Sequence, residues 1–244
     1  MILIELKAQN AAMKTHSILP IVAVLFAAFA AVTSPSAHAF ITTSSLDDFS
    51  TSTDGWKIGS AGVQPSQVAA AGPDSQIGYL SSFSDNVGAN GKWLMWSDEA
   101  EWQGDYLSAG VTGINLWANV SAGTSPVSMS IAFDGPGGWF ASSAQSVGAG
   151  WANYAFTLDS ANFAYVSSSG GTGVLANTLA GVTRFEILAG GGGVSYRSGG
   201  DIVQAGSSIN TILVDNIGAV PEPSTYALLL MTGAGALWLA RRRR

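Results

Sequence analysis

The chain has 244 residues, with 16 acidic and 10 basic side chains, no cysteine and two histidines. Between Phe40 and Ala219 four basic residues stand against fourteen acidic ones, a net charge of −10, and His16 and His38 both precede that segment. A segment without Cys or His has no disulfide, no Ser-His-Asp triad, no cysteine nucleophile and no thiolate or imidazole metal ligand, and its acidity disfavours nucleic-acid binding.

The first 39 residues have the order of parts of a secretory signal peptide. A lysine precedes the apolar run 18–32, and the small residues Ala37 and Ala39 follow at the positions that an export peptidase requires. We expect signal peptidase to cleave after Ala39, leaving Phe40 at the new N-terminus, and Met13 to be the natural start. The alternative is a transmembrane helix that stays attached.

The segment 40–219 is predicted to be one all-β domain. Alternation of apolar with small or polar residues, the period of half-buried strands, occurs at 114–120, 127–133, 154–158, 183–187 and 212–217. Turn-forming glycine and proline residues separate these runs, and only 174–180 favours a short helix. The four glycines 190–193 are interpreted as a flexible loop, because the ending of a phosphate-binding loop is missing. We predict an antiparallel β-sandwich of the jelly-roll type.

Three aspartates near the ends of this domain are candidate calcium ligands: Asp47, Asp48 and Asp215. The first and last strands are neighbours in many sandwiches, so these side chains could meet. Carboxylate oxygens are the ligands that calcium prefers, and they suit a chain without histidine. The alternative is that the aspartates cap turns through their own backbone.

Five tryptophans are the candidate glycan-binding residues: Trp93, Trp96, Trp102, Trp117 and Trp139. Indole rings can stack on the apolar faces of sugars, while neighbouring amides and carboxylates bond the hydroxyl groups. The same rings also supply the large apolar area that a core without disulfides needs. Both interpretations stand; Trp117 alternates against the core-facing residues of its strand, which favours an outer sheet face for it.

The candidate catalytic residues are the carboxylates of Glu99 and Glu101, with Asp98 and Asp105 nearby. On a strand, Glu99 and Glu101 would share one face, and paired carboxylates among tryptophans suggest glycoside hydrolysis. Their spacing does not match the Glu-x-Asp arrangement of jelly-roll glucanases. A solvated acidic loop in a non-catalytic domain is therefore the preferred interpretation, and a glycoside hydrolase is the alternative.

The C-terminal tail has three parts. Pro221, Glu222 and Pro223 come first, and the prolines predict an extended, accessible segment. The apolar run 226–240 follows, which as a helix would span about 25 Å, at the short end for crossing a bilayer. Four arginines close the tail and are expected to stop transfer on the cytoplasmic side: Arg241, Arg242, Arg243 and Arg244.

The tail resembles the PEP-CTERM sorting signal of exported Gram-negative bacterial proteins in its Pro-Glu-Pro motif, its apolar helix and its arginine cluster. The resemblance implies recognition by an exosortase, a membrane-embedded cysteine transpeptidase-like enzyme that would cut near the motif. It also implies a place at the cell surface or in an exopolysaccharide matrix. The alternative is an ordinary C-terminal membrane anchor.

From Phe83 to Ala219 the order of features is similar to that of the laminin B-type domain, a galactose-binding-like jelly roll. The points of similarity include Ile114-Asn115-Leu116-Trp117, Phe133-Asp134-Gly135 and Leu213-Val214-Asp215-Asn216-Ile217. The opening Leu46-Asp47-Asp48-Phe49 with Asp54-Gly55-Trp56 is also typical of β-sandwich carbohydrate-binding modules. These resemblances imply binding of glycan or matrix polymer, and related modules often hold a structural calcium.

Together these features predict an exported surface or matrix protein that is not an enzyme. Its parts are a signal peptide (1–39), a β-sandwich (40–219) and a sorting tail (220–244) with a single transmembrane helix. Its expected partners are signal peptidase, exosortase and a polysaccharide. We expect an inner-membrane precursor whose sandwich, after tail removal, reaches the surface or matrix.

Overall fold

The computed structural model describes residues 40–59, 62–73, 76–84, 93–123, 126–166, 170–196, 202–205 and 210–222. Over these residues the chain forms antiparallel β-strands together with one α-helix, α2 (Leu175–Leu179), and the short 3-10 turn η2 (Ala100–Trp102). The prediction of an all-β antiparallel domain with a short helix inside 174–180 is confirmed.

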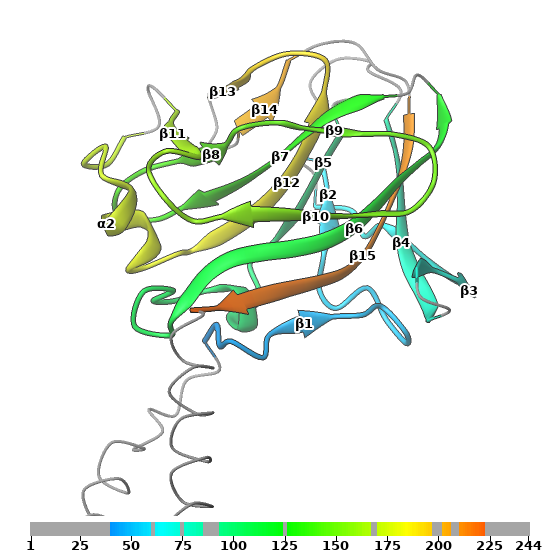
Figure 1. Ribbon diagram of the computed structural model, residues 1–244, viewed down its shortest axis with the longest axis horizontal. Helices are drawn as coiled ribbons and strands as arrows, with labels where there is room; N and C mark the ends of the chain where they lie inside the picture. The colour runs from blue at the N-terminus through cyan, green and yellow to red at the C-terminus, as the bar shows by residue number, and fades with distance from the viewer. Residues whose placement is uncertain are drawn as a thin grey trace, which may run out of the picture. The chain divides into compact units, whose positions relative to one another are not determined.

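The first sheet has six strands in the order β10-β6-β15-β4-β3, with β1 pairing on β15. They are β1 (Leu46–Asp47), β3 (Ser66–Ala71), β4 (Ile77–Ser84), β6 (Val111–Gly123), β10 (Ala152–Thr157) and β15 (Asn210–Pro221). Along β6, Leu116 and Ala118 are buried whereas Asn115 and Trp117 are partly exposed, which confirms the predicted alternation. Figure 1 shows β6 and β15 as long neighbouring strands.

The second sheet has seven strands in the order β11-β8-β7-β12-β5-β2, with β9 pairing on β7. They are β2 (Lys57–Ile58), β5 (Trp93–Ser97), β7 (Val127–Asp134), β8 (Phe140–Ser142), β9 (Gln145–Val147), β11 (Phe163–Tyr165) and β12 (Arg184–Gly190). A separate hairpin pairs β13 (Val194–Tyr196) with β14 (Ile202–Gln204), and β14 lies against β12 and β5 (Figure 1).

The two sheets pack on one apolar core that is rich in aromatic rings. Phe185 of β12 stacks on Phe133 of β7 at 5.0 Å between ring centroids. Trp56 and Trp102 lie 5.4 and 5.2 Å from Phe185, and Tyr106 lies 5.2 Å from Phe133. All five side chains are fully buried, so this cluster supplies much of the apolar area that a domain without disulfides requires.

One buried carboxyl group organises the tryptophans of this core. Oδ2 of Asp47 accepts the indole N–H groups of both Trp56 and Trp102, each at 2.6 Å. Burial, together with the smaller effect of the neighbouring Glu101 carboxylate, raises the pKa of Asp47 to about 8, although the two indole hydrogen bonds lower it. Asp47 is therefore a structural group that fixes two core rings.

The last strand runs two residues past Ala219, at which the sequence predicts the domain to end. Pro221 pairs with Val111 of β6 after a shift in register, which fits a residue that cannot donate to the ladder. The N–H of Glu222 then donates to the carbonyl of Gly110 at 3.0 Å. Pro221 is half-buried and bonded into a sheet edge, so the expectation of an accessible segment is wrong for this residue.

Candidate binding cleft

The outer face of the second sheet carries its own apolar cluster. Leu94, Ala132 and Leu188 lie on β5, β7 and β12 and belong to this cluster, not to the core between the sheets. Ile202 of β14 packs on them, so the hairpin covers part of the outer face. The other buried members are Trp139, Ala141 and Val166.

Glycines connect the two arms of the hairpin and let it approach the sheet. The N–H of Gly192 donates to the carbonyl of Ala205 at 2.6 Å, and the N–H of Ala205 donates to Gly193 at 2.8 Å. A Cβ atom at Gly190 would stand 2.8 Å from the Ala205 carbonyl, so this approach requires a residue without a side chain. The glycine run interpreted as a loop thus positions β14 and, with it, Gln204.

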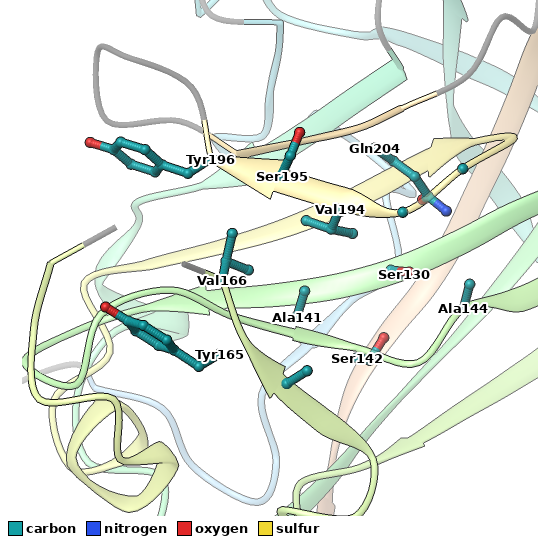
Figure 2. A pocket seen from close by; sticks show the side chains of 13 residues that line it. Ser130, Ala141, Ser142, Ala144, Tyr165, Val166, Val194, Ser195, Tyr196 and Gln204 are labelled. Carbon is teal, nitrogen blue, oxygen red and sulfur yellow. The ribbon is translucent and has the colours of Figure 1, made fainter. Parts of the chain in front are cut away.

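An open cleft of about 420 Å³ lies beside the hairpin. Figure 2 shows residues of the hairpin along one wall, residues of β8 and β11 along the other, and Ser130 of β7 between them. Among the described residues that line the cleft, none carries a charge. This volume lies in the range of small-ligand sites, and the lining mixes apolar surface with a few polar groups, as such sites do.

Gln204 is the most unusual residue of this cleft. Its side chain is 1% exposed, yet neither its amide nitrogen nor its amide oxygen has a hydrogen-bond partner among the described residues. Figure 2 shows the amide directed from the hairpin toward the side of the cleft where Ser130 and Ala144 lie. A buried amide without partners costs about 1–3 kcal/mol, so such a group calls for a ligand or ordered water.

Two tyrosines stand at the other end of the cleft (Figure 2). The hydroxyl of Tyr165 donates to the carbonyl of Gly170 at 2.7 Å, and its ring lies 5.5 Å from that of Phe140. Tyr196 packs in part against the outer apolar cluster. These contacts hold two rings at the cleft, where each can offer an apolar face and a polar edge to a ligand.

Three of the five tryptophans predicted for glycan stacking are buried. Trp93 and Trp139 are 2% exposed and Trp102 is 0% exposed, so no sugar ring can stack on them. The indole N–H of Trp93 donates to the carbonyl of Ser82 at 3.1 Å, and that of Trp102 bonds Asp47. The stacking prediction is wrong for these three residues, because Trp93 and Trp102 are packed into the core and Trp139 into the outer apolar cluster.

The other two tryptophans reach the surface on different sheets. Trp96 on β5 is partly buried beneath two cations, with Lys57 Nζ 4.6 Å and Arg184 Cζ 4.0 Å from its ring centroid. Trp117 on β6 lines a shallow hollow of the first sheet together with Asp48 and Asn216. Neither ring lines the cleft beside Gln204.

The predicted catalytic carboxylates do not share a strand face. Glu99 precedes the turn η2 and Glu101 lies within it. Both line an open hollow of about 560 Å³ with Asp47, Asp48 and Asp54. Asp105 instead accepts bonds from the N–H and hydroxyl of Ser108, which hold its pKa below the usual range.

The three predicted calcium ligands separate into one structural residue and one pair. Oδ2 of Asp47 is taken by the two indoles, whereas Asp48 lies close enough to Asp215 to raise its pKa. Burial is the larger cause, and together they raise the pKa of Asp215 to about 7. Oδ2 of Asp215 is buried without a hydrogen-bond partner among the described residues.

Oxygen atoms border a small space beside Gly72. A Cβ atom there would stand 2.6 Å from Asp215 Oδ2, 3.1 Å from the carbonyl of Gly78 and 3.6 Å from that of Gln76. Carboxylate and carbonyl oxygens are the types of ligand that a hard cation takes, and the Gln76 carbonyl also accepts the N–H of Gly72 at 2.7 Å. Within the described ranges, no group of three or more acidic or histidine side chains forms a metal site.

Other predicted features lie outside the described residues. These are the signal-peptide residues Ala37 and Ala39, the apolar run 226–240, Pro223 and the four arginines. Phe40 is described and is 43% exposed. In the described part of the chain, no helix has the length and apolar character needed to cross a bilayer.

The C-terminal region, from the end of β15 onward, contains the residues that the sequence predicts to be a sorting signal. Residues 219–244 match the family described as the PEP-CTERM protein-sorting motif. The chain carries a PEP-CTERM motif. This motif implies export and a membrane-anchored precursor, and its first residues, Ala219 to Pro221, belong to β15.

Solved structures similar to this chain include carbohydrate-binding modules. The family 11 module from Clostridium thermocellum, in complex with a β-1,3-1,4-mixed-linked tetrasaccharide, is 14% identical with a TM-score of 0.46, over 74% of this chain and 96% of that one. The CBM22-1 xylan-binding domain from Paenibacillus barcinonensis is 12% identical with a TM-score of 0.42, over 74% and 98%. Comparison with curated proteins finds no match.

Because the Gln204 amide has no partner among the described residues, we expect an apolar substitution at this position to increase stability. Gln204→Leu keeps most of the volume and removes two buried polar atoms, so we expect the free energy of unfolding to rise by about 1 kcal/mol. Gln145→Leu is the matched control, because Gln145 donates to the carbonyl of Ala155 at 2.6 Å and should lose stability. Denaturant unfolding of both variants checks this; a clear loss of stability in Gln204→Leu would contradict it.

Proposed function

We propose that this chain is an exported surface or matrix protein whose β-sandwich binds an uncharged polysaccharide in the cleft beside Gln204. The observation that carries the proposal is the buried amide of Gln204 at the wall of the cleft, which has no hydrogen-bond partner among the described residues. A sugar offers hydroxyl groups that can donate to the amide oxygen and accept from its N–H groups. The rings of Tyr165 and Tyr196 offer stacking surfaces at the other end.

The charge of the cleft supports an uncharged ligand. No described residue that lines it is charged, and the segment from Phe40 to Ala219 carries a net charge of −10. A uronate or sulfate group would lose hydration in the cleft and find no basic partner among the described lining residues, and the net negative charge of the domain would repel it. A neutral glycan has no charge to desolvate and is not repelled by the negative domain, so we assign the cleft to neutral polysaccharide.

The sorting tail supports the location. A PEP-CTERM motif implies exosortase processing, and the N-terminal pattern of charged, apolar and small residues supports export with cleavage after Ala39. The protein is therefore proposed to mature from an inner-membrane precursor to a surface or matrix component of a Gram-negative cell. Phe40 would become its first residue.

The rival function is a glycoside hydrolase at the acidic hollow around Glu99 and Glu101. One observation favours it: the hollow gathers several carboxyl groups, and the pKa of Asp47 among them is raised to about 8. Asp47 is occupied by two indole bonds and is 2% exposed, which argues for a structural role. We therefore propose a non-catalytic domain.

A structural cation is a second proposal. Asp215 and Asp48, with the carbonyls that face Gly72, are the residues that would hold calcium, and Asp47 is not among them. Oδ2 of Asp215, which is buried and has no partner within the described ranges, supports this assignment. A bound cation would neutralise two carboxylates that otherwise repel each other where the first and last strands meet.

For polysaccharide binding, we predict that Tyr165→Ala and Tyr196→Ala each weaken affinity by about tenfold, since each removes a stacking ring. Trp117→Ala is the matched control on the other sheet and should bind like the wild type. Affinity electrophoresis in gels containing neutral or anionic polysaccharides gives the measurement. Retention that survives in both tyrosine variants but disappears in Trp117→Ala would refute the cleft, and sugar release that Glu99→Gln or Glu101→Gln abolishes would establish the hydrolase.

For the cation, we predict that calcium stabilises the domain more at pH 8 than at pH 5.5. Asp215, with a pKa of about 7, is protonated at the lower pH, so calcium must then displace a proton. At 100 times its dissociation constant the ion should add about 2.7 kcal/mol at pH 8. Thermal unfolding of wild type, Asp215→Asn and the control Asp159→Asn tests this. An unchanged melting temperature with calcium or chelator at pH 8 would exclude the site.

A further inference from the structure

The sorting motif and the folded domain share residues. The matched sorting region begins at residue 219, whereas β15 continues to Pro221. The strand therefore ends inside the Pro221-Glu222-Pro223 motif. No spacer separates the sheet from the residues that the sorting machinery reads.

Hydrogen bonds to the backbone hold this shared segment, at Ala219 on one side and at Val220 and Glu222 on the other. The N–H of Ala219 donates to the carbonyl of Ser45 at 3.0 Å, on the side of β1. On the side of β6, the hydroxyl of Thr112 lies 3.4 Å from the carbonyl of Val220, which accepts its hydrogen bond. The N–H of Glu222 donates to Gly110 at 3.0 Å. Pro221 and the N–H of Glu222 are thus held by Val111 and Gly110 on one side, and the β1 side holds the chain as far as Ala219.

A partner that reads this motif needs the same backbone. Extended peptides are commonly recognised through main-chain hydrogen bonds and alternate side chains, as an added strand. In the folded domain the N–H of Glu222 already bonds Gly110, next to β6, and half-buried Pro221 already pairs with Val111 of β6. The partner and β6 therefore exclude each other.

We propose that β6 competes with the sorting enzyme for residues 219–222, so that the motif is read only after this end of β15 separates from Gly110–Gly113. The inference rests on the exosortase processing proposed above. The rest of the strand stays in place, because Ile212, Val214 and Ile217 are buried in the core. Release of the motif therefore requires only a local opening of the strand end, and the rest of the domain stays folded.

The absence of cysteine from the whole chain makes this opening directly testable. A Cβ atom built at Gly113 lies 3.4 Å from the Cβ of Val220, close to the separation that a disulfide requires. Gly113→Cys with Val220→Cys would lock the strand end one residue before the motif. The built atom also lies 3.0 Å from the carbonyl of Phe156, so the single Gly113→Cys variant controls for crowding.

The experiment follows conversion of the full-length precursor by pulse-chase in cells that contain an exosortase. We expect the locked double variant to be processed at least about tenfold more slowly than either single variant, with the rate restored by a thiol reductant. Normal processing of the oxidised double variant would overturn the inference.

A second variant acts in the opposite direction and does not depend on disulfide formation. Insertion of Gly-Ser-Gly-Ser between Ala219 and Val220 moves the intact motif out of the ladder while keeping its distance to the apolar run. The insertion removes about one net hydrogen bond that holds the motif in the folded domain, so processing should become about fivefold faster. An unchanged rate would also overturn the inference.

A triple-alanine variant of Pro221, Glu222 and Pro223 separates the two proposals. If this variant is processed normally, the exosortase assignment itself fails. If it is blocked while the locked variant is processed normally, only the competition between β6 and the enzyme fails.

Discussion

The structure depends on a sheet that is covered on both faces. On β7 and β12, Phe133 and Phe185 face the aromatic core, while Ala132 and Leu188 face the hairpin β13–β14. Covering the outer face removes apolar surface from water, but the hairpin is too narrow to cover the whole sheet. The cleft is the part left open, and Gln204, at the end of the covering strand, is buried beside it. The same packing thus produces both a second core and an incompletely satisfied polar group.

Strand β15 connects the other functional features. It pairs with β1, β4 and β6, and it places Asp215, whose Oδ2 has no hydrogen-bond partner among the described residues, near Asp48. Six residues further on, the same strand delivers Pro221 into the pairing with Val111. Stability of the domain, the proposed cation site and exposure of the sorting motif are therefore linked through one strand. A cation that tightens the β1–β15 junction would act on the segment from which the motif must be released.

The sequence predicts those strands that have one buried face and one exposed face. On β6 the alternation of Leu116 and Trp117 is clear, and the structure agrees. The alternation misleads where both faces of a strand are covered. Glu186 is expected on the face away from the core, yet it is fully buried, with its Oε1 2.8 Å from Nη2 of Arg184. The cleft residues Gln204, Tyr165 and Tyr196 lie in short segments without a period, so no one-dimensional signal marks them. The sequence instead favours tryptophans as binding residues, but ring area alone does not distinguish a core residue from one on a binding surface.

The most direct test of glycan binding observes the side-chain amide of Gln204 by nuclear magnetic resonance during titration with neutral oligosaccharides such as cellohexaose and xylohexaose. Binding in the cleft predicts that the two amide protons of Gln204 shift and exchange more slowly with water, because the sugar supplies their missing partners. Shifts confined to the indole groups of Trp96 or Trp117, with the Gln204 amide unchanged, would contradict the assignment.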